Sequence, residues 1–191
     1  MMYMTKNELT KILIAESLKN LASEAALDKI SVQHIVDACS INRKTFYYHF
    51  QDKQQLICWI FHTDLSKCIK ANKGDKLLYE IIQYLYLNRG FYVAALTSKA
   101  QNNLREHLFE LTYNECKSEI ITLLASREMP AKHIILLARY FANAIIGSLV
   151  QWAKEGMTTP PEEYGVEFSP ITKECLKFII DKYTSNENHQ G

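Results

Sequence analysis

The sequence has few of the residues that interrupt helices, with six glycines and four prolines among its 191 residues. It also has almost no stretches in which apolar and polar residues alternate, the pattern of half-buried strands. Apolar residues make up 48% of the chain, which is enough for a substantial core. These features predict an all-α protein.

Paired cysteines and an excess of either charge are missing as well. The cysteines are odd in number and none belongs to a CxxC pair, which argues against a disulfide framework and a zinc site; they are Cys39, Cys58, Cys68, Cys116 and Cys175. The formal net charge is only +1. A nucleic-acid partner would therefore be contacted by cations concentrated in one place.

Motifs of catalysis are absent too. There is no HExxH, phosphate-loop or GxSxG pattern. The central histidines show no metal-like pairing; they are His49, His62, His107 and His133. We therefore expect no enzyme activity, no catalytic residues, no metal and no cofactor.

Neither a signal peptide nor a clear membrane span is evident. The opening residues, MMYMTKNELTK, contain no apolar run. Residues 134–153 are long enough to cross a bilayer, but they include Arg139 near the middle, where charge is costly in lipid. We interpret this stretch as a helix buried on several faces and expect a cytoplasmic protein without a membrane partner.

Capping residues mark the helix starts. Thr5 and Glu8 fit a capping box ahead of a helix over about residues 6–24. Ser31 and Asn42 are N-cap candidates for two short helices, and a longer helix follows over residues 53–70. Two short helices joined by a tight turn form a helix-turn-helix unit. We predict such a domain over residues 1–53, with the helix at 53–70 as its link to the rest.

The remaining chain predicts a larger helical domain over residues 71–185 and a disordered tail at 186–191. Its last two long helices are expected over 131–155 and 170–183, the second opened by Pro170. The first is apolar on more than one face and carries small residues that allow close helix approach, namely Ala142, Ala144, Gly147 and Ser148. It fits a dimer interface or the core helix of a monomer.

The ten residues INRKTFYYHF, at 41–50, combine large apolar side chains with two cations. Phe46 and Phe50 are four residues apart, so they share one helix face and are expected to pack with Ile41 and Ile35. The other face then carries Arg43, Lys44, Tyr47 and Tyr48, with His49 at its edge. An ordinary solvated face fits this composition, but adjacent exposed tyrosines favour a partner, and we expect this partner to be the DNA major groove.

Residues 30–61, ISVQHIVDACSINRKTFYYHFQDKQQLICWIF, resemble the DNA-binding domain of TetR-family transcriptional regulators. The positions that match are Ser31, Ile35, Thr45, Phe46, Tyr47, His49, Phe50 and Lys53. Ser40 departs from the glycine usual in the family's turn, and serine costs more there if the backbone needs a positive φ. Residues 91–110, FYVAALTSKAQNNLREHLFE, are similar to the branch that includes regulators of dihydroxyacetone-kinase operons.

The resemblance implies a homodimer that binds a palindromic operator in double-stranded DNA and is controlled by a small molecule or a protein co-regulator at the C-terminal domain. Base contacts are implied for Arg43, Lys44 and Tyr48. Phosphate contacts are implied for Ser31, Thr45, Tyr47, His49 and Lys53. The alternative is a protein-interaction module that keeps this fold but has lost DNA binding, which the near-neutral charge and Ser40 would suit.

Candidates for an effector pocket are aromatic and polar residues of the central region. They are Phe91, Tyr92, Arg105, Phe109, Tyr113, Tyr140 and Asn143. Aromatic residues at helical spacing also fit an ordinary core. Arg105 fits either an anionic effector or a surface ion pair.

Overall fold

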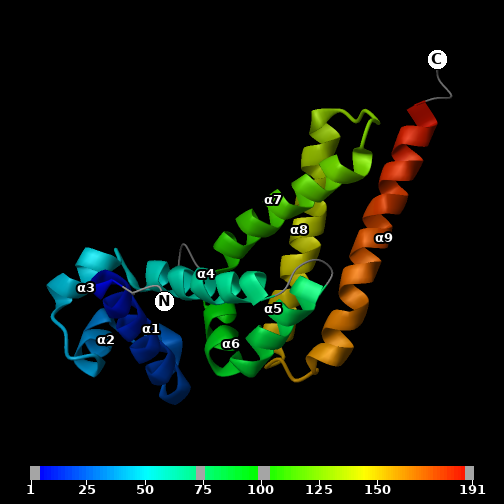
Figure 1. The fold of residues 1–191 in the computed structure, drawn as a ribbon. Helices are drawn as coiled ribbons and strands as arrows, with labels where there is room; N and C mark the ends of the chain where they lie inside the picture. The colour runs from blue at the N-terminus through cyan, green and yellow to red at the C-terminus, as the bar shows by residue number, and fades with distance from the viewer. Residues whose placement is uncertain (1–4, 72–75, 99–103, 188–191) are drawn as a thin grey trace.

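The computed structural model describes residues 5–71, 76–98 and 104–187 (Figure 1). Within these ranges all regular secondary structure is helical, which confirms the predicted all-α class. Figure 1 shows a small group of helices at the N-terminal end and a larger group that rises at the C-terminal end, with α4 running between them.

The N-terminal group contains α1 (Lys6–Glu24), a 3₁₀ turn η1 (Leu27–Lys29), α2 (Val32–Ala38) and α3 (Arg43–His49). The predicted capping box at α1 is present, because the Glu8 N–H donates to the Thr5 hydroxyl oxygen and the Thr5 N–H donates to Glu8. Ser31 begins α2 with a second box, in which the His34 ring accepts from the Ser31 N–H. Local hydrogen bonds therefore define where both helices begin.

The C-terminal group follows α4 (Lys53–Ala71). It consists of α5 (Lys76–Leu87), α6 (Arg89–Thr97), α7 (Leu104–Leu124), α8 (Ala131–Lys154) and α9 (Pro161–Glu187). α7 packs against α8, and α9 packs against α5 and α7. One apolar core extends from α1 through α4 to the end of α8, and a second joins α7, α8 and α9.

The start of the last helix corrects the prediction, because α9 begins at Pro161 rather than at Pro170. Proline suits the first position of a helix, where its missing N–H would have no partner in any case. The ring of Tyr164 stacks on the Trp152 ring with centroids 4.4 Å apart, which anchors this first turn on α8. The helix continues to Glu187, so the predicted tail is helical at its start, and residues 188–191 lie outside the described residues.

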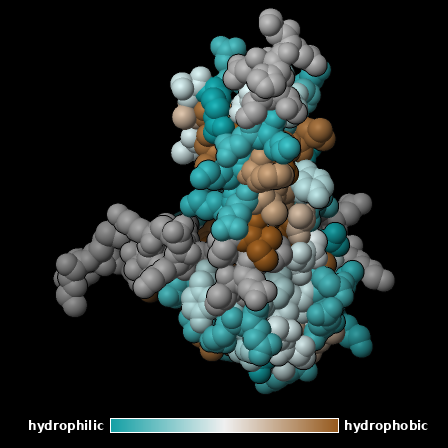
Figure 2. All heavy atoms as spheres, turned by 90° about the vertical axis from the view of Figure 1, so that its right-hand side faces the viewer, coloured by the Kyte–Doolittle hydropathy of each residue, from teal (hydrophilic) through white to brown (hydrophobic). Residues whose placement is uncertain are grey.

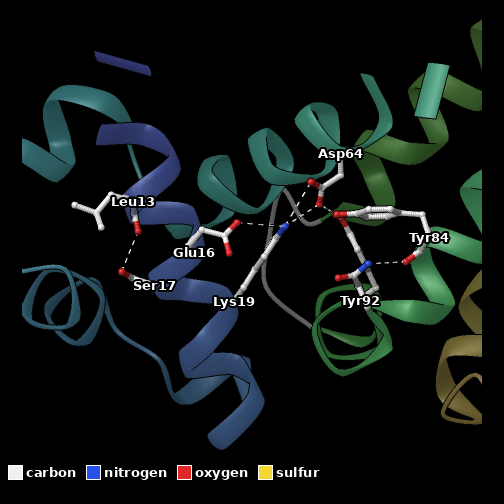
Figure 3. A network of polar contacts seen from close by, with 8 residues as sticks. Leu13, Glu16, Ser17, Lys19, Asp64, Tyr84 and Tyr92 are labelled. Carbon is white, nitrogen blue, oxygen red and sulfur yellow. Dashed lines mark hydrogen bonds and ion pairs between the residues drawn. The ribbon is translucent and has the colours of Figure 1, made fainter. Parts of the chain in front are cut away.

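A buried polar network ties the two groups of helices together (Figure 3). Asp64 lies on α4, and its side chain is 3% exposed. It accepts hydrogen bonds from Lys19 Nζ on α1 at 3.0 Å and from the Tyr92 hydroxyl on α6 at 2.6 Å. Since a buried carboxylate is costly without such partners, this contact holds α1, α4 and α6 in one arrangement.

Candidate nucleic-acid interface and ligand groove

The turn between α2 and α3 has a left-handed residue at its centre. Ser40 has φ +53°. The Ser40 N–H donates to the Asp37 carbonyl at 3.2 Å, and the Ile41 N–H donates to the Val36 carbonyl at 3.0 Å. This pair of bonds is the Schellman motif, in which glycine usually holds the left-handed position. The turn therefore keeps its geometry although serine replaces glycine.

α3 is held in place by its cap and by two phenylalanines. The Asn42 side-chain oxygen accepts from the Thr45 N–H at 2.7 Å and from the Thr45 hydroxyl at 3.0 Å. Phe46 is fully buried and Phe50 is 2% exposed. Seven residues are too few for a helix to be stable alone, so these contacts maintain it. The predicted inward face is confirmed.

The outward face of α3 is cationic and aromatic. Arg43 and Lys44 are exposed, and Tyr48 is 76% exposed. Arg43 Nη2 donates to the Tyr47 hydroxyl at 3.1 Å, with the guanidinium 5.7 Å from the ring centre. α3 itself contains no acidic residue. This face therefore presents donors and ring surface without a competing carboxylate on the same helix.

Ser31 and Thr45 differ in how their hydroxyl groups are engaged. The Ser31 oxygen accepts from the His34 N–H at 3.2 Å, which leaves the Ser31 hydroxyl hydrogen available to a ligand. The Thr45 hydroxyl donates to Asn42 and is half-buried. A contact from Thr45 to an anion would therefore first break this bond.

His49 is half-buried at the edge of the outward face. Its Nδ1 is buried and has no hydrogen-bond partner among the described residues. Burial, together with the nearby Lys11 ammonium, lowers the pKa of His49. The imidazole is therefore neutral at pH 7, and a protonated Nε2 is the donor it would offer.

Two lysine side chains make contacts that the sequence did not indicate. Lys53 Nζ donates to the Leu27 and Ile30 carbonyls, each at 2.6 Å. These bonds hold the segment that precedes α2 against the start of α4. Lys11 on α1 lies 6.0 Å from the centre of the Phe50 ring, beside the end of α3. Lys11 lies outside the helix-turn-helix motif, so only the packing of α1 identifies it as a neighbour of this surface.

An open groove of about 840 Å³ lies between the start of α4 and helices α7 and α8. Three of the predicted effector residues, Arg105, Phe109 and Asn143, line it. Arg105 is exposed and forms no ion pair with any residue in the described ranges. The other lining residues are Gln51, Asp52, Gln54, Gln55, Cys58, Glu106, His107, Glu110 and Ile146. Because Gln51 and Asp52 lie in the short segment between α3 and α4, the groove adjoins the candidate DNA-contacting unit.

The other four predicted effector residues lie elsewhere. Phe91 and Tyr92 are buried in the core. Tyr113 stacks on Phe109 with ring centroids 6.3 Å apart and packs toward the second core. Tyr140 is 65% exposed on α8. These four residues do not line the groove.

His62 on α4 and His107 on α7 meet at the side of this region. Their Nε2 atoms are 2.5 Å apart and their ring centroids 4.4 Å apart. Burial and the neighbouring His62 lower the pKa of His107. The two residues are 45 positions apart in the chain, so their spacing carried no signal of this pairing.

Comparisons with known proteins agree with this architecture. A family model described as "Bacterial regulatory proteins, tetR family" matches residues 14–57, and one described as "Transcriptional regulator C-terminal region" matches residues 74–174. The chain is 34% identical over 93 residues to the HTH-type dhaKLM operon transcriptional activator DhaS of Lactococcus lactis subsp. lactis (strain IL1403). That match covers 47% of this chain and 50% of the relative, so the chain spans about half the relative's length.

A solved structure has a similar fold. The structure titled "Dihydroxyacetone kinase operon activator DhaS" superposes with a TM-score of 0.58 and covers 92% of this chain and 96% of that one. The two sequences are 21% identical, so this likeness concerns the fold alone.

Proposed function

The chain belongs to the TetR family of transcriptional regulators, which are DNA-binding proteins and not enzymes, and from this we propose that it acts as a homodimer on a palindromic DNA operator. We further propose that a small molecule or a protein partner, bound by the C-terminal helices, controls its affinity for that operator. The relative from Lactococcus is named an activator of the dhaKLM operon, and control of an operon of this kind is part of the proposal.

The observation that carries the proposal is the outward face of α3. Arg43 and Lys44 can donate to guanine in the major groove, and Tyr48 projects beside them. We assign phosphate contacts to Ser31, Thr45, Tyr47, His49 and Lys53, and add Lys11 because it lies beside α3. Two of the three N–H donors of Lys53 are already bound to main-chain carbonyls, so the third would make its phosphate contact. Phosphate contacts position the protein, whereas base contacts specify the sequence.

Dimer formation is supported by an apolar stripe on the outer face of α8. Leu136, Tyr140, Ala144 and Gly147 follow one another at helical spacing, and all four are exposed. A Cβ atom added at Gly147 would meet no atom of a neighbouring element within 4 Å. α8 is long and apolar enough to cross a membrane, and only 28% of its most apolar window is buried in one chain. A second copy of the chain would cover this stripe.

α9 contributes a matching surface. Ile171 and Phe178 are 56% and 63% exposed. Figure 2 shows apolar side chains in brown among hydrophilic ones on the face that corresponds to the right-hand side of Figure 1, where α9 runs. Exposed apolar area of this kind marks protein interfaces. We propose that α8 and α9 of two copies pack together as the dimer interface.

Effector control is assigned to the groove between α4, α7 and α8. Arg105, Phe109 and Asn143 offer a cation, a ring and an amide on one side, and Gln51 and Asp52 come from the segment that follows α3. A ligand bound there would contact both groups of helices. We propose that residues 1–53 form the DNA-binding domain and residues 71–185 the effector domain. We also propose that the protein is cytoplasmic.

The DNA test compares two double variants that lose the same charge. Arg43→Ala with Lys44→Ala removes two base contacts, each worth about 1–3 kcal/mol, so affinity for the chain's own promoter DNA should fall at least tenfold. Lys117→Ala with Lys154→Ala removes exposed cations of α7 and α8 and should leave affinity unchanged. Both are measured by fluorescence anisotropy at one fixed salt concentration.

Equal affinity of both double variants would contradict DNA recognition by α3. If even the unaltered chain prefers no promoter fragment over random DNA, the protein-interaction module becomes the better account.

The dimer test uses Gly147→Leu. Gly147 is exposed, a Cβ atom added there meets no atom within 4 Å, and leucine favours the helix, so the fold should persist. In a dimer the added side chain would hold the two α8 helices apart. We expect a shift from dimer to monomer in sedimentation, whereas Leu87→Asp, at a 70% exposed position on α5, should stay dimeric. A dimer unaffected by Gly147→Leu would place the interface elsewhere.

A further inference from the structure

The contact between His62 and His107 joins two helices through the same ring atom of each residue. His62 lies on α4 and is exposed, while His107 lies on α7 and is half-buried. Their Nε2 atoms face each other at 2.5 Å. A neutral imidazole has one protonated nitrogen and one lone pair. When both rings carry the proton on Nδ1, two Nε2 lone pairs converge on one point, which is the arrangement that a metal ion requires.

We propose that His62 and His107 form a binding site for one divalent transition-metal ion of the class that includes Zn²⁺, Co²⁺, Ni²⁺ and Cu²⁺. Imidazole nitrogen suits these metals, and histidine is their commonest protein ligand. A zinc–nitrogen bond is about 2.0–2.1 Å long, so the two Nε2 atoms would separate by roughly 1 Å to admit the ion. Because His62 is exposed, a small rotation of its side chain can supply this distance.

The site offers two protein ligands and leaves its other positions open. Among the residues that the structure describes, no three His, Cys, Asp or Glu side chains are placed to hold one ion. Cys58 lies one helical turn before His62, but burial raises its pKa and keeps the thiol protonated. Structural zinc sites are closed by four protein ligands, so this one belongs to the open class, completed by water or by a donor atom of a bound molecule.

The surroundings of the site favour a cation. His107 lines the groove together with three carboxylates, Asp52, Glu106 and Glu110, and one cation, Arg105. The excess of negative charge lowers the energy of a nearby positive ion. An ion bound to both histidines would clamp α4, which carries the helix-turn-helix unit, to α7. This inference does not depend on DNA binding or dimer formation.

The test titrates the untagged full-length chain, stripped of metal, with Co²⁺ and with Zn²⁺. Calorimetry and the visible absorption of Co²⁺ should show one ion per chain. His62→Gln and His107→Gln should each weaken binding at least tenfold, since glutamine keeps the polarity and the helix but has no imidazole. His133→Gln is the matched control, because His133 contacts Tyr183 between α8 and α9, and it should bind as the unaltered chain does.

The unfolding temperature gives a second measurement. Bound Zn²⁺ should raise the unfolding temperature of the unaltered chain and of His133→Gln, but not that of His62→Gln or His107→Gln. Binding that persists in the double variant His62→Gln with His107→Gln would overturn the proposal, as would its loss in Cys58→Ser. If neither Co²⁺ nor Zn²⁺ binds saturably below about 1 mM, the two histidines share a hydrogen bond and do not form a metal site.

Discussion

Ser40 and Gly156 occupy the same position in two copies of one helix-ending motif. Gly156 has φ +74°, its N–H donates to the Ala153 carbonyl, and the Met157 N–H donates to the Trp152 carbonyl. The bonds of Ser40 and Ile41 at the end of α2 follow the same pattern. The motif at α8 therefore has glycine at the left-handed position, which glycine adopts freely. The motif at α2 has serine there, and serine adopts the left-handed conformation at a cost.

Ser40→Gly should stabilise the protein. The left-handed conformation costs a residue with a Cβ about 1–2 kcal/mol, and the greater freedom of glycine in the unfolded chain offsets about 0.4–1 kcal/mol of the gain. We expect the free energy of unfolding to rise by about 0.5–1 kcal/mol in chemical denaturation. Gly156→Ser should lower it, and two variants of unchanged stability would show that neither turn is strained.

His49 should make stability depend on pH below neutrality. Burial lowers the pKa of its folded form from 6.5, so the unfolded chain takes up this proton at a higher pH than the folded chain does. The contribution of neutral His49 to the free energy of unfolding is therefore complete above pH 6.5. It is lost as the pH falls from 6.5 toward the lower pKa of the folded state. His49→Gln should lose less stability between about pH 7.5 and about pH 5.5 than the unaltered chain, as measured by thermal unfolding. An equal loss in both would refute this role.

At the scale of elements, α3 depends on a cap outside its own residues. Asn42→Ala removes the acceptor for two Thr45 donors and should cost about 1 kcal/mol of stability and also weaken DNA binding. Asn42→Asp keeps the acceptor, so stability should be retained. Its negative charge should still lower DNA affinity by repelling phosphate. Denaturation and anisotropy measured on both variants separate the two effects, and an equal loss of stability would contradict the role of the cap.

Helix starts were predictable where a side chain bonds to its own first turn. Thr5, Ser31 and Asn42 each cap the helix expected from the sequence. α9 differs, because Pro161 and Pro170 are equally good first residues by local rules. The choice depends on the stacking of Tyr164 on Trp152, a contact with another helix that no local pattern encodes.

At the scale of the whole molecule, Lys19 pairs with a carboxylate that water scarcely reaches. The Asp64 side chain is 3% exposed and that of Lys19 is 19% exposed. Lys19→Met leaves the carboxylate buried without its cation and should cost about 3 kcal/mol. Glu16→Gln, at an exposed position 3.9 Å from Lys19, should cost almost nothing. If both variants unfold at the same denaturant concentration, this network does not join the two groups of helices.

The candidate sites were predictable to different degrees. The outward face of α3 follows from the four-residue spacing of Phe46 and Phe50, which commits the remaining side chains to the other side. Of the residues that line the groove, only Arg105, Phe109 and Asn143 were among the predicted effector residues. The groove forms between α4, α7 and α8, so its other lining residues depend on how these helices pack. Burial of Phe91 and Tyr92 in the core shows that aromatic residues at helical spacing do not by themselves mark a pocket.

Four features could be predicted from the sequence alone: the all-α class, the capped helices, the helix-turn-helix unit and the division of α3 into two faces. Each of these depends on hydrogen bonds and spacings within a few residues. The start of α9, the two carbonyls that bind Lys53 and the contact between His62 and His107 became clear only from the packed helices. These features depend on contacts between distant segments, whose geometry arises only when the helices pack.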